Sequence, residues 1–492
     1  MKNRAWAWKI TGTIVVVLMS WALLVMVTGV QRLKKAKATL RAQGESLNWR
    51  DIVANVPGGD SNGEHDFLAA IDGLAKQPGG MFSECFTAYG ERIPLALCPP
   101  IPTEIKEYTS SRTIRRWSTN VWVETEPFLQ MGADNWDFAK RAATNDTIML
   151  TLNWSAGAHL RLPHLSAQKT LFAWIRMAVL NDLREGNGAA ALDKIITGYR
   201  LLEIYHEPIM ISVLVERSCG YLLAGAVWEM WTHDGWTDAQ LARLQQSVDA
   251  MRIEDAADRA LQMERSLVVT EWGRTLRDPS ALKSRWASST SAWELTLANT
   301  PIWRMFVSNA DLAWYLENSR RELEAYRVGY RARSKAAHDA AFAKTSGAMP
   351  RNYLFSRRFG VHAKGFGEKV LRSENHRELM VTAIALKRFR LKHGRYPEKL
   401  AELMPGFLAD APVDWMDGKE LRYERLNDDQ FRLWSVGNNG IDDGGDPLVP
   451  GSKTDMNPEH GRDWVWPQVS APADIEAFIK SRETEMKKAK KP

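Results

Sequence analysis

The chain has 492 residues, of which 45% are hydrophobic and 25% are charged. This composition is globular, and the length allows roughly two to four domains. Its 65 basic and 59 acidic side chains leave a formal charge of +6, and much of that excess lies in lysine clusters at the two ends. The body is therefore expected to be nearly neutral, which argues against nucleic acid as a principal partner.

Residues 10–30 carry no charged side chain and follow a short tail, residues 1–9. A helix rises 1.5 Å per residue, so this segment is long enough to cross a bilayer core of about 30 Å. We therefore predict a transmembrane helix over residues 10–30 that contacts the lipid bilayer. A cleaved signal peptide is the alternative, with Val27 and Gly29 as small residues at a cleavage site. The length of the apolar run and the basic cluster after it favour an uncleaved anchor.

The charges that flank the anchor give a weak signal for its orientation. Three basic residues precede it and five follow it, a difference that slightly favours a cytoplasmic body. A long domain can be translocated despite flanking charge, and the C-terminal resemblance described below indicates the other side of the membrane. We predict a single-pass protein of the cell inner membrane with its body in the periplasm.

Residues 31–127 are predicted to form a short basic juxtamembrane helix and a loop-rich region. Cys85 and Cys98 lie 13 residues apart in a proline-rich stretch. They would be able to form a disulfide in the periplasm, and an unpaired state is the alternative. Cys219 lies in an apolar helical pattern and is predicted to be a buried free thiol. No cysteine or histidine spacing indicates zinc.

The stretch from Arg41 to Trp49, Arg-Ala-Gln-Gly-Glu-Ser-Leu-Asn-Trp, resembles a segment of large membrane-anchored bacterial proteins of unknown function from planctomycete and verrucomicrobial lineages. In those proteins the segment precedes a helical body. The resemblance therefore implies a helical body here as well.

Residues 128–345 show helical periodicity almost throughout and are predicted to form a helical domain. Apolar residues recur at helical spacing on both sides of Gly186, which predicts two antiparallel helices joined there. Ala191 and Gly198 resemble the small residues at which a tetratricopeptide hairpin packs closely. No clean second copy follows at that period, so an irregular helical array is favoured over a repeat solenoid.

Residues 346–372 are basic and interrupted by glycine, and they are predicted to be a linker. Residues 373–470 read as an α+β module in which a helix stops near Gly394 and Pro397. The stretches 421–424 and 430–435 alternate like the strands of a small antiparallel sheet. Residues 471–492 are predicted to be a basic C-terminal tail.

The module carries a sequence of signals that resembles one protein family. His393-Gly394-Arg395-Tyr396-Pro397 is followed by an Asp-Trp-Met-Asp-Gly turn at residues 414–418, by two strands, and by an acidic glycine loop from Gly437 to Asp446. This order resembles the C-terminal domain of the major pseudopilin, protein G of type II secretion. The resemblance covers under a fifth of the chain, and it implies an extracytoplasmic α+β domain.

In major pseudopilins the loop after this strand binds calcium. The resemblance therefore implies a Ca²⁺ site, with ligands at the four positions Asp442, Asp443, Asp446 and Asp455. Carboxylate oxygens on a loop that glycine allows to curl are typical Ca²⁺ ligands. An acidic surface loop that caps its own turns is the alternative.

Two features separate the chain from the pseudopilins themselves. No pseudopilin leader site precedes the apolar segment, and a body of several hundred residues separates it from the module. The sequence therefore does not predict a subunit that polymerises into a pilus.

The chain contains no nucleophile elbow, phosphate-binding loop or dinucleotide fingerprint. Glu264 and Arg265 place a charged pair inside an apolar helical stretch. A catalytic acid beside a substrate-binding cation is one interpretation, and a polar tie between helices is the favoured one. The sequence identifies no catalytic and no cofactor-binding residue.

Together these patterns predict a mainly α fold: an N-terminal transmembrane helix, an irregular tetratricopeptide-like body, and a small C-terminal α+β domain with an antiparallel sheet. The predicted function is a non-enzymatic scaffold that binds a protein partner in the cell envelope, with a link to secretion. The alternative is a membrane-anchored hydrolase or carbohydrate-active enzyme that uses carboxylates of the helical domain. A deep cleft lined by two or more carboxylates would favour the enzyme.

Overall fold

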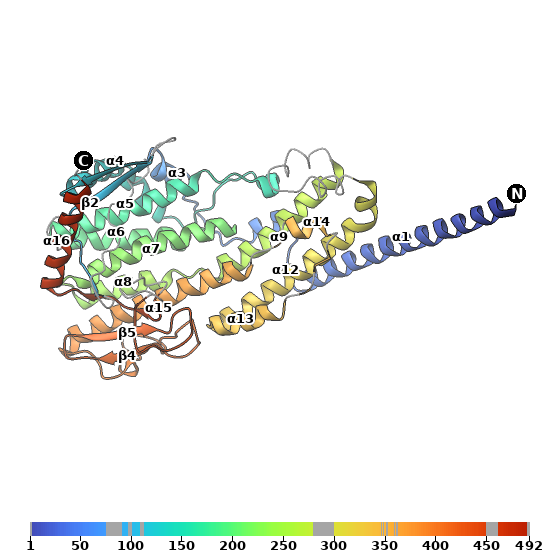
Figure 1. Cartoon of the computed structure of the whole chain (residues 1–492). Coiled ribbons are helices and arrows are strands. Elements are labelled where there is room, and N and C mark those ends of the chain that lie inside the picture. The colour runs from blue at the N-terminus through green and yellow to red at the C-terminus, as the bar shows by residue number, and fades with distance from the viewer. Residues whose placement is uncertain are drawn as a thin grey trace.

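The computed structural model is mainly helical and carries small sheets (Figure 1). The predicted helical domain is confirmed. Cys219 is buried and free, whereas Cys85, Cys98 and Asp455 lie outside the residues that the structure describes. Those residues are 2–74, 91–96, 101–108, 113–278, 300–345, 347, 349–350, 353–358, 360, 363–448 and 461–489.

The α-helices follow one another along the chain as α1 (Lys2–Ala42), α2 (Trp49–Ala54), α3 (Glu64–Ile71), α4 (Val121–Ala143), α5 (His164–Arg184), α6 (Gly188–Ile204), α7 (Met210–Thr232), α8 (Asp238–Ala250), α9 (Glu254–Arg277), α12 (Ser308–Arg331), α13 (Lys335–Ala343), α14 (Leu354–Arg358), α15 (Ala363–His393) and α16 (Pro472–Ala489). Shorter helical turns are η1 (Trp154–His159), the π-type turn η2 (Trp303–Val307) and η3 (Leu400–Leu403).

The strands are short and pair locally, with one exception. Strand β4 (Arg422–Arg425), β5 (Phe431–Ser435) and β6 (Trp464–Val465) form an antiparallel sheet in that order. Strand β2 (Thr103–Tyr108) pairs with β3 (Thr113–Ser118). The exception is the parallel pair of β1 (Glu91–Arg92) and β7 (Gln468–Val469), a separate sheet that joins the N-terminal third of the chain to the segment after β6.

The predicted helix pair around Gly186 is present as α5 and α6, which pack side by side. Gly186 has a φ of +78°, a left-handed conformation that glycine adopts without strain. Gly198 is a close-packing site, because a Cβ built there would lie 3.1 Å from a methyl group of Leu223 on α7. Thr237 forms a complete capping box with Gln240 at the start of α8.

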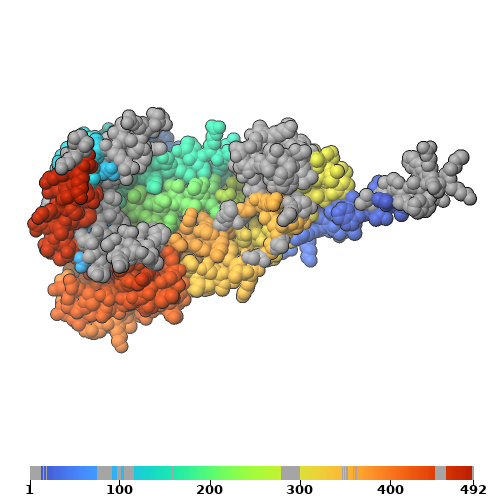
Figure 2. Space-filling model, viewed as in Figure 1, coloured from blue at the N-terminus to red at the C-terminus, as the bar shows by residue number. Residues whose placement is uncertain are grey.

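Helix α1 is one uninterrupted helix, although the sequence patterns predicted an anchor and a separate juxtamembrane helix. Its first part extends away from the body as a narrow rod (Figures 1 and 2). Its second part packs on α12 and contributes Leu33, Ala36 and Leu40 to a buried cluster with Leu312 and Leu316. The body is therefore attached to this rod without a flexible joint.

A buried carboxylate follows α1 and fixes its end to the body. Glu45 is buried, and its Oε2 lies 2.6 Å from Arg265 Nη2 of α9. Arg327 of α12 donates to Glu45 Oε1 at 2.9 Å and to both oxygens of Asp258 at 2.7 and 3.0 Å. We name Glu45, Asp258, Arg265 and Arg327 the Glu45 network. It confirms Arg265 as a polar tie between helices, with Glu45 as its partner.

The C-terminal sheet shares one hydrophobic core with the helical body. Trp231 of α7 donates its indole N–H to Ala383 O of α15 at 3.0 Å, and its ring meets Phe431 of β5 edge to face. Trp228 donates to Pro467 O at 2.9 Å. Helix α15 thus belongs to the helical core and to the sheet at the same time.

Several predicted segments differ from the structure in their local conformation. Residues 346–372, predicted as a linker, include α14 and the beginning of α15, and Phe355 is fully buried. The module helix begins at Ala363, ten residues before its predicted start at Ser373. The predicted basic tail contains α16, and the region 31–127, predicted as loop-rich, contains the β2–β3 hairpin.

Within the described residues, α7 is the helix whose length and hydropathy suit a membrane span, and 44% of its most apolar window is buried inside the body. A core helix of a soluble protein has the same length and composition, so this is weak support for a membrane location. Side chains of α1 are described from Thr13 onward, except at positions 15 and 18.

The Glu45 network generates a prediction about stability. Glu45→Gln leaves the buried Arg265 cation without its counter-charge, and we expect a loss of about 3 to 5 kcal/mol in the free energy of unfolding. Denaturant unfolding of the full chain in detergent measures this loss. Glu485→Gln is the control, because Glu485 pairs with Arg482 at the surface and its loss costs less than about 1 kcal/mol. Equal stability of the two variants would contradict the role of Glu45.

Candidate functional site

The most polar part of the core lies between the first turns of α5 and α7. His164 and Gln168 lie one turn apart on α5, and Ser212 and Glu216 one turn apart on α7, while the loop before α7 adds Tyr205 and Glu207. All six residues are buried, and we name them the α5–α7 polar layer. The two helices pack along much of their length, and a bridge between Ile148 and Tyr205 holds the loop against them.

Glu207 is the centre of the hydrogen bonds in this layer. Its Oε2 accepts the phenolic proton of Tyr205 at 2.6 Å and lies 3.0 Å from His164 Nε2. The other oxygen, Oε1, is buried and makes no hydrogen bond. The layer therefore holds a carboxylate that is only half satisfied.

Further polar atoms in the layer have no protein partner. They are both side-chain polar atoms of Gln168, the Ser212 hydroxyl and Glu216 Oε1. Buried polar groups in native proteins are almost always hydrogen-bonded, to protein or to bound water. The α5–α7 polar layer therefore has unused capacity to bind water or a small polar ligand.

Burial and neighbouring charges shift the pKa values of Glu216 in the layer and of Cys219 beside it. Burial, and then the charge of Glu207, raises the pKa of Glu216 well above its usual value. Burial and the neighbouring Glu216 raise the pKa of the Cys219 thiol in the same way. Both shifts favour the protonated form, that is, the carboxylic acid of Glu216 and the thiol of Cys219.

Glu216, with its raised pKa, lies near the His164–Glu207 pair, and this is the composition of an acid–base site. Catalysis also needs an opening through which substrate reaches these groups. Neither Glu207 nor Glu216 lines any of the three pockets described below, all of which lie in the described part of the chain.

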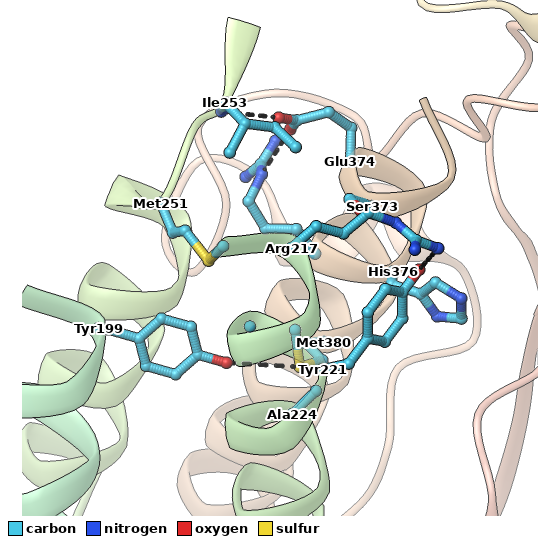
Figure 3. A pocket seen from close by; sticks show the side chains of 12 residues that line it. Tyr199, Arg217, Tyr221, Ala224, Met251, Ile253, Ser373, Glu374, His376 and Met380 are labelled. Carbon is cyan, nitrogen blue, oxygen red and sulfur yellow. Dashed lines mark hydrogen bonds and ion pairs between the residues drawn. The ribbon is translucent and has the colours of Figure 1, made fainter. Parts of the chain in front are cut away.

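A small cavity lies among α6, α7, the connection between α8 and α9, and α15 (Figure 3). Its volume is about 30 Å³, the space of a single water molecule. Among its lining residues, Glu374 supplies the carboxylate, which accepts hydrogen bonds from Ile253 N at 3.2 Å and Arg377 Nε at 2.9 Å. Tyr199 directs its hydroxyl toward Met380 Sδ at 3.9 Å. The cavity therefore lies at a junction where α6, α7 and α15 pack together.

His376, at the same cavity, is a half-buried imidazole. It lies inside α15, with its ring stacked on Trp464 at 4.9 Å between centroids. Burial, and then the nearby Arg217 and Arg372, lowers the pKa of His376 to about 3. It cannot act as a general acid near neutral pH.

The predicted Ca²⁺ ligands lie in one loop, and each described one already has hydrogen-bond partners. Asp442 accepts from Trp434 Nε1 at 2.9 Å and from Gly444 N at 3.1 Å. Asp443 accepts from Asn439 Nδ2 at 2.9 Å. Asp446 accepts from Leu448 N and Arg462 Nη1, both at 3.0 Å. Partners of this kind are those of a loop that caps its own turns.

Asp463 accepts hydrogen bonds from the backbone of this loop, a role that the sequence patterns did not indicate. Its Oδ2 accepts from Gly445 N at 2.7 Å and Asp446 N at 3.2 Å. Its Oδ1 is buried without a hydrogen-bond partner. Burial is the main cause that raises the pKa of Asp463 to about 6.

Three other side chains have the right types and proximity for a metal. His338 and Asp339 of α13 and Glu368 of α15 each offer one ligand atom, and these atoms lie within 4.8 Å of one another. The Asp339 carboxylate is already paired with Lys335 Nζ at 2.6 Å and lies 3.2 Å from His338 Nδ1. The group is therefore an ion-pair cluster in which Lys335 supplies the positive charge.

Comparisons with protein-family models, with curated proteins and with solved structures found no significant match for this chain. Functional inference therefore rests on the residues and contacts of the chain itself.

The α5–α7 polar layer generates a prediction about pH dependence. The folded chain keeps a proton on Glu216 that the unfolded chain releases above its ordinary pKa of 4.5. The stability from this group is therefore present below pH 4.5 and is lost as the pH rises. Glu216→Gln removes the titration, so the free energy of unfolding should fall less steeply above pH 4.5, by up to about 1.4 kcal/mol per pH unit.

Thermal unfolding of wild type and variant over this pH range in detergent is the measurement. Glu485→Gln, at an exposed ion pair, is the control that should keep the wild-type slope. If Glu216→Gln also keeps the wild-type slope, Glu216 is not a buried neutral acid.

Proposed function

We propose that the chain is a single-pass protein of the cell inner membrane, anchored by α1 through residues 10–30, with a periplasmic body that acts as a scaffold for a protein partner in the envelope. The supporting observation is a rod of exposed apolar side chains. Each is 40 to 67% exposed on α1: Ile14, Val16, Val17, Met19, Trp21, Leu23, Leu24 and Val27. In water such a surface is unfavourable, whereas in a bilayer it is solvated.

Contacts between α1 and α12 attach the body to the proposed anchor. Gly29 lies where α1 first meets α12, and a Cβ built there would be 3.3 Å from Ala310 Cβ. Three residues later, Arg32 donates to both oxygens of Glu317, at 2.9 and 2.6 Å. Because the helix is continuous from the exposed rod to these contacts, the membrane sets the orientation of the body.

A groove at the C-terminal sheet is the best partner surface among the described residues. It encloses about 440 Å³ beside β5 and β7. Leu426 and Val469 line it and are each more than 40% exposed, and Glu91, Arg432 and Asp446 surround them. An apolar centre with a charged rim is the usual organisation of a protein interface. The pseudopilin resemblance of this region supports a link to secretion.

The alternative is a membrane-anchored hydrolase or carbohydrate-active enzyme. The buried pair Glu207 and Glu216 favours it, because such enzymes use two neighbouring carboxyl groups. That neither residue lines one of the three pockets favours the scaffold.

A phosphatase reporter fused to the C-terminus tests the proposed anchor and topology in one experiment. In the wild type we expect an active reporter that stays with membranes after an alkaline wash. Met19→Arg combined with Leu23→Arg places two charges at the centre of the span, at about 2.5 to 3.5 kcal/mol each, and should abolish both properties. Leu426→Arg, at an exposed apolar residue of the body, is the control and should retain both. A wild-type reporter that is soluble or inactive would overturn the proposal.

We extend the proposal to Ca²⁺ at the acidic loop, with Asp442, Asp443, Asp446 and Asp455 as ligands. The expected result is that millimolar calcium raises the melting temperature of the full chain in detergent, because the ion binds the folded state. Asp442→Asn combined with Asp446→Asn should remove the shift, whereas Asp249→Asn on α8 should retain it. Equal shifts in the double variant and the wild type would show that the loop does not bind the ion.

A further inference from the structure

A polar groove lies between α1 and α12, just beyond the anchor. It encloses about 470 Å³. Helix α1 lines it with Thr28, Gln31 and Lys35, and α12 contributes Arg320. The α1 residues recur three or four positions apart, so they lie on one face of the helix.

The groove carries a net positive charge, because one ion pair within it is neutral and two further cations remain. Arg32 and Glu317 also line the groove, but they bind each other through two hydrogen bonds. The Glu317 hydrogen bond is the main cause that raises the pKa of Arg32. Lys35 and Arg320 form no ion pair or side-chain hydrogen bond with the described part of the chain. Two cations therefore face the groove without a counter-ion.

The depth of the groove matches that of lipid phosphates. Lys35 follows the end of the proposed span, residue 30, by five positions, which is about 7.5 Å along a helix. The headgroup layer extends roughly 5 to 8 Å beyond the hydrocarbon core on each side. The ammonium of Lys35 and the guanidinium of Arg320 thus lie where phosphates lie. Leu24 and Val27, exposed on α1 closer to the N-terminus, continue toward the bilayer interior.

We propose that this groove binds the phosphate headgroup of an anionic phospholipid, with Lys35 and Arg320 as the charged contacts and the acyl chains along the exposed apolar face of α1. The inference rests on the proposed anchor. Gln31 lines the same groove and offers its amide N–H groups to the phosphate. The Thr28 hydroxyl donates to Leu24 O and Val25 O within α1. A net anionic lipid is favoured over a zwitterionic one because a zwitterionic headgroup brings its own cation to the site.

Native mass spectrometry of the full chain, purified in detergent with equal amounts of phosphatidylglycerol and phosphatidylcholine, tests the proposal. The wild type should retain phosphatidylglycerol preferentially. Lys35→Ser combined with Arg320→Ser should reduce that preference about thirtyfold, at about 1 kcal/mol for each cation. Lys487→Ser combined with Lys488→Ser removes the same charge from α16 and should leave the preference unchanged. A large excess of inorganic phosphate should not displace the lipid, because the acyl chains add to its binding.

Three outcomes contradict the proposal: equal retention of the two lipids by the wild type, an unchanged preference in the groove variant, or complete displacement by phosphate, which would indicate a site for a free anion. If the chain retains no lipid of either kind and the reporter fusion is soluble, the anchor itself is wrong. If it retains phosphatidylcholine as well as phosphatidylglycerol, the anchor stands and the headgroup site is wrong.

Discussion

The position of the body depends on a single buried carboxylate. Glu45 follows the long helix α1 directly and lies between Arg265 of α9 and Arg327 of α12. A buried cation without a counter-charge is strongly unfavourable, so the three helices are held at one geometry in which these charges meet. The apolar contacts of Leu33 and Leu40 on α1 then form in register with that geometry. A long helix that ends in such a network fixes the orientation of the body relative to its own axis.

The helical body and the C-terminal sheet behave as one unit for a related reason. Helix α15 packs on α7 and α8 and also covers β5, so that no boundary between two cores exists there. Local patterns predicted β4 and β5 to within one residue at each end, because side-chain alternation and turn residues are local properties. They did not predict α15 before Ser373, since Gly365 and Gly367 resemble helix breakers. In the fold, Gly367 makes room for the His338 ring, whose Nε2 would lie 2.5 Å from an added Cβ.

In the candidate sites too, the sequence indicated residues that are neighbours in the chain but not the contacts between distant residues. The acidic loop was visible in the sequence because its aspartates are neighbours, yet their hydrogen bonds to Trp434 and Arg462 depend on the fold. Glu207 and Glu216 share no motif spacing with His164, so only the packing of α5 on α7 brings them into one layer. The basic residues after the anchor were likewise apparent, but the pairing of Arg32 with Glu317, which leaves Lys35 and Arg320 free, was not.

The central claim is that α1 leaves the bilayer and docks on α12 as one rigid helix. A disulfide between Gly29→Cys and Ala310→Cys tests it most directly, because a Cβ at position 29 lies 3.3 Å from Ala310 Cβ, close to the usual separation of bonded cysteines. In native membranes under mild oxidation, the double variant should form an intramolecular crosslink that neither single variant forms. Absence of that crosslink, or crosslinking only between two copies of the chain, would contradict the account.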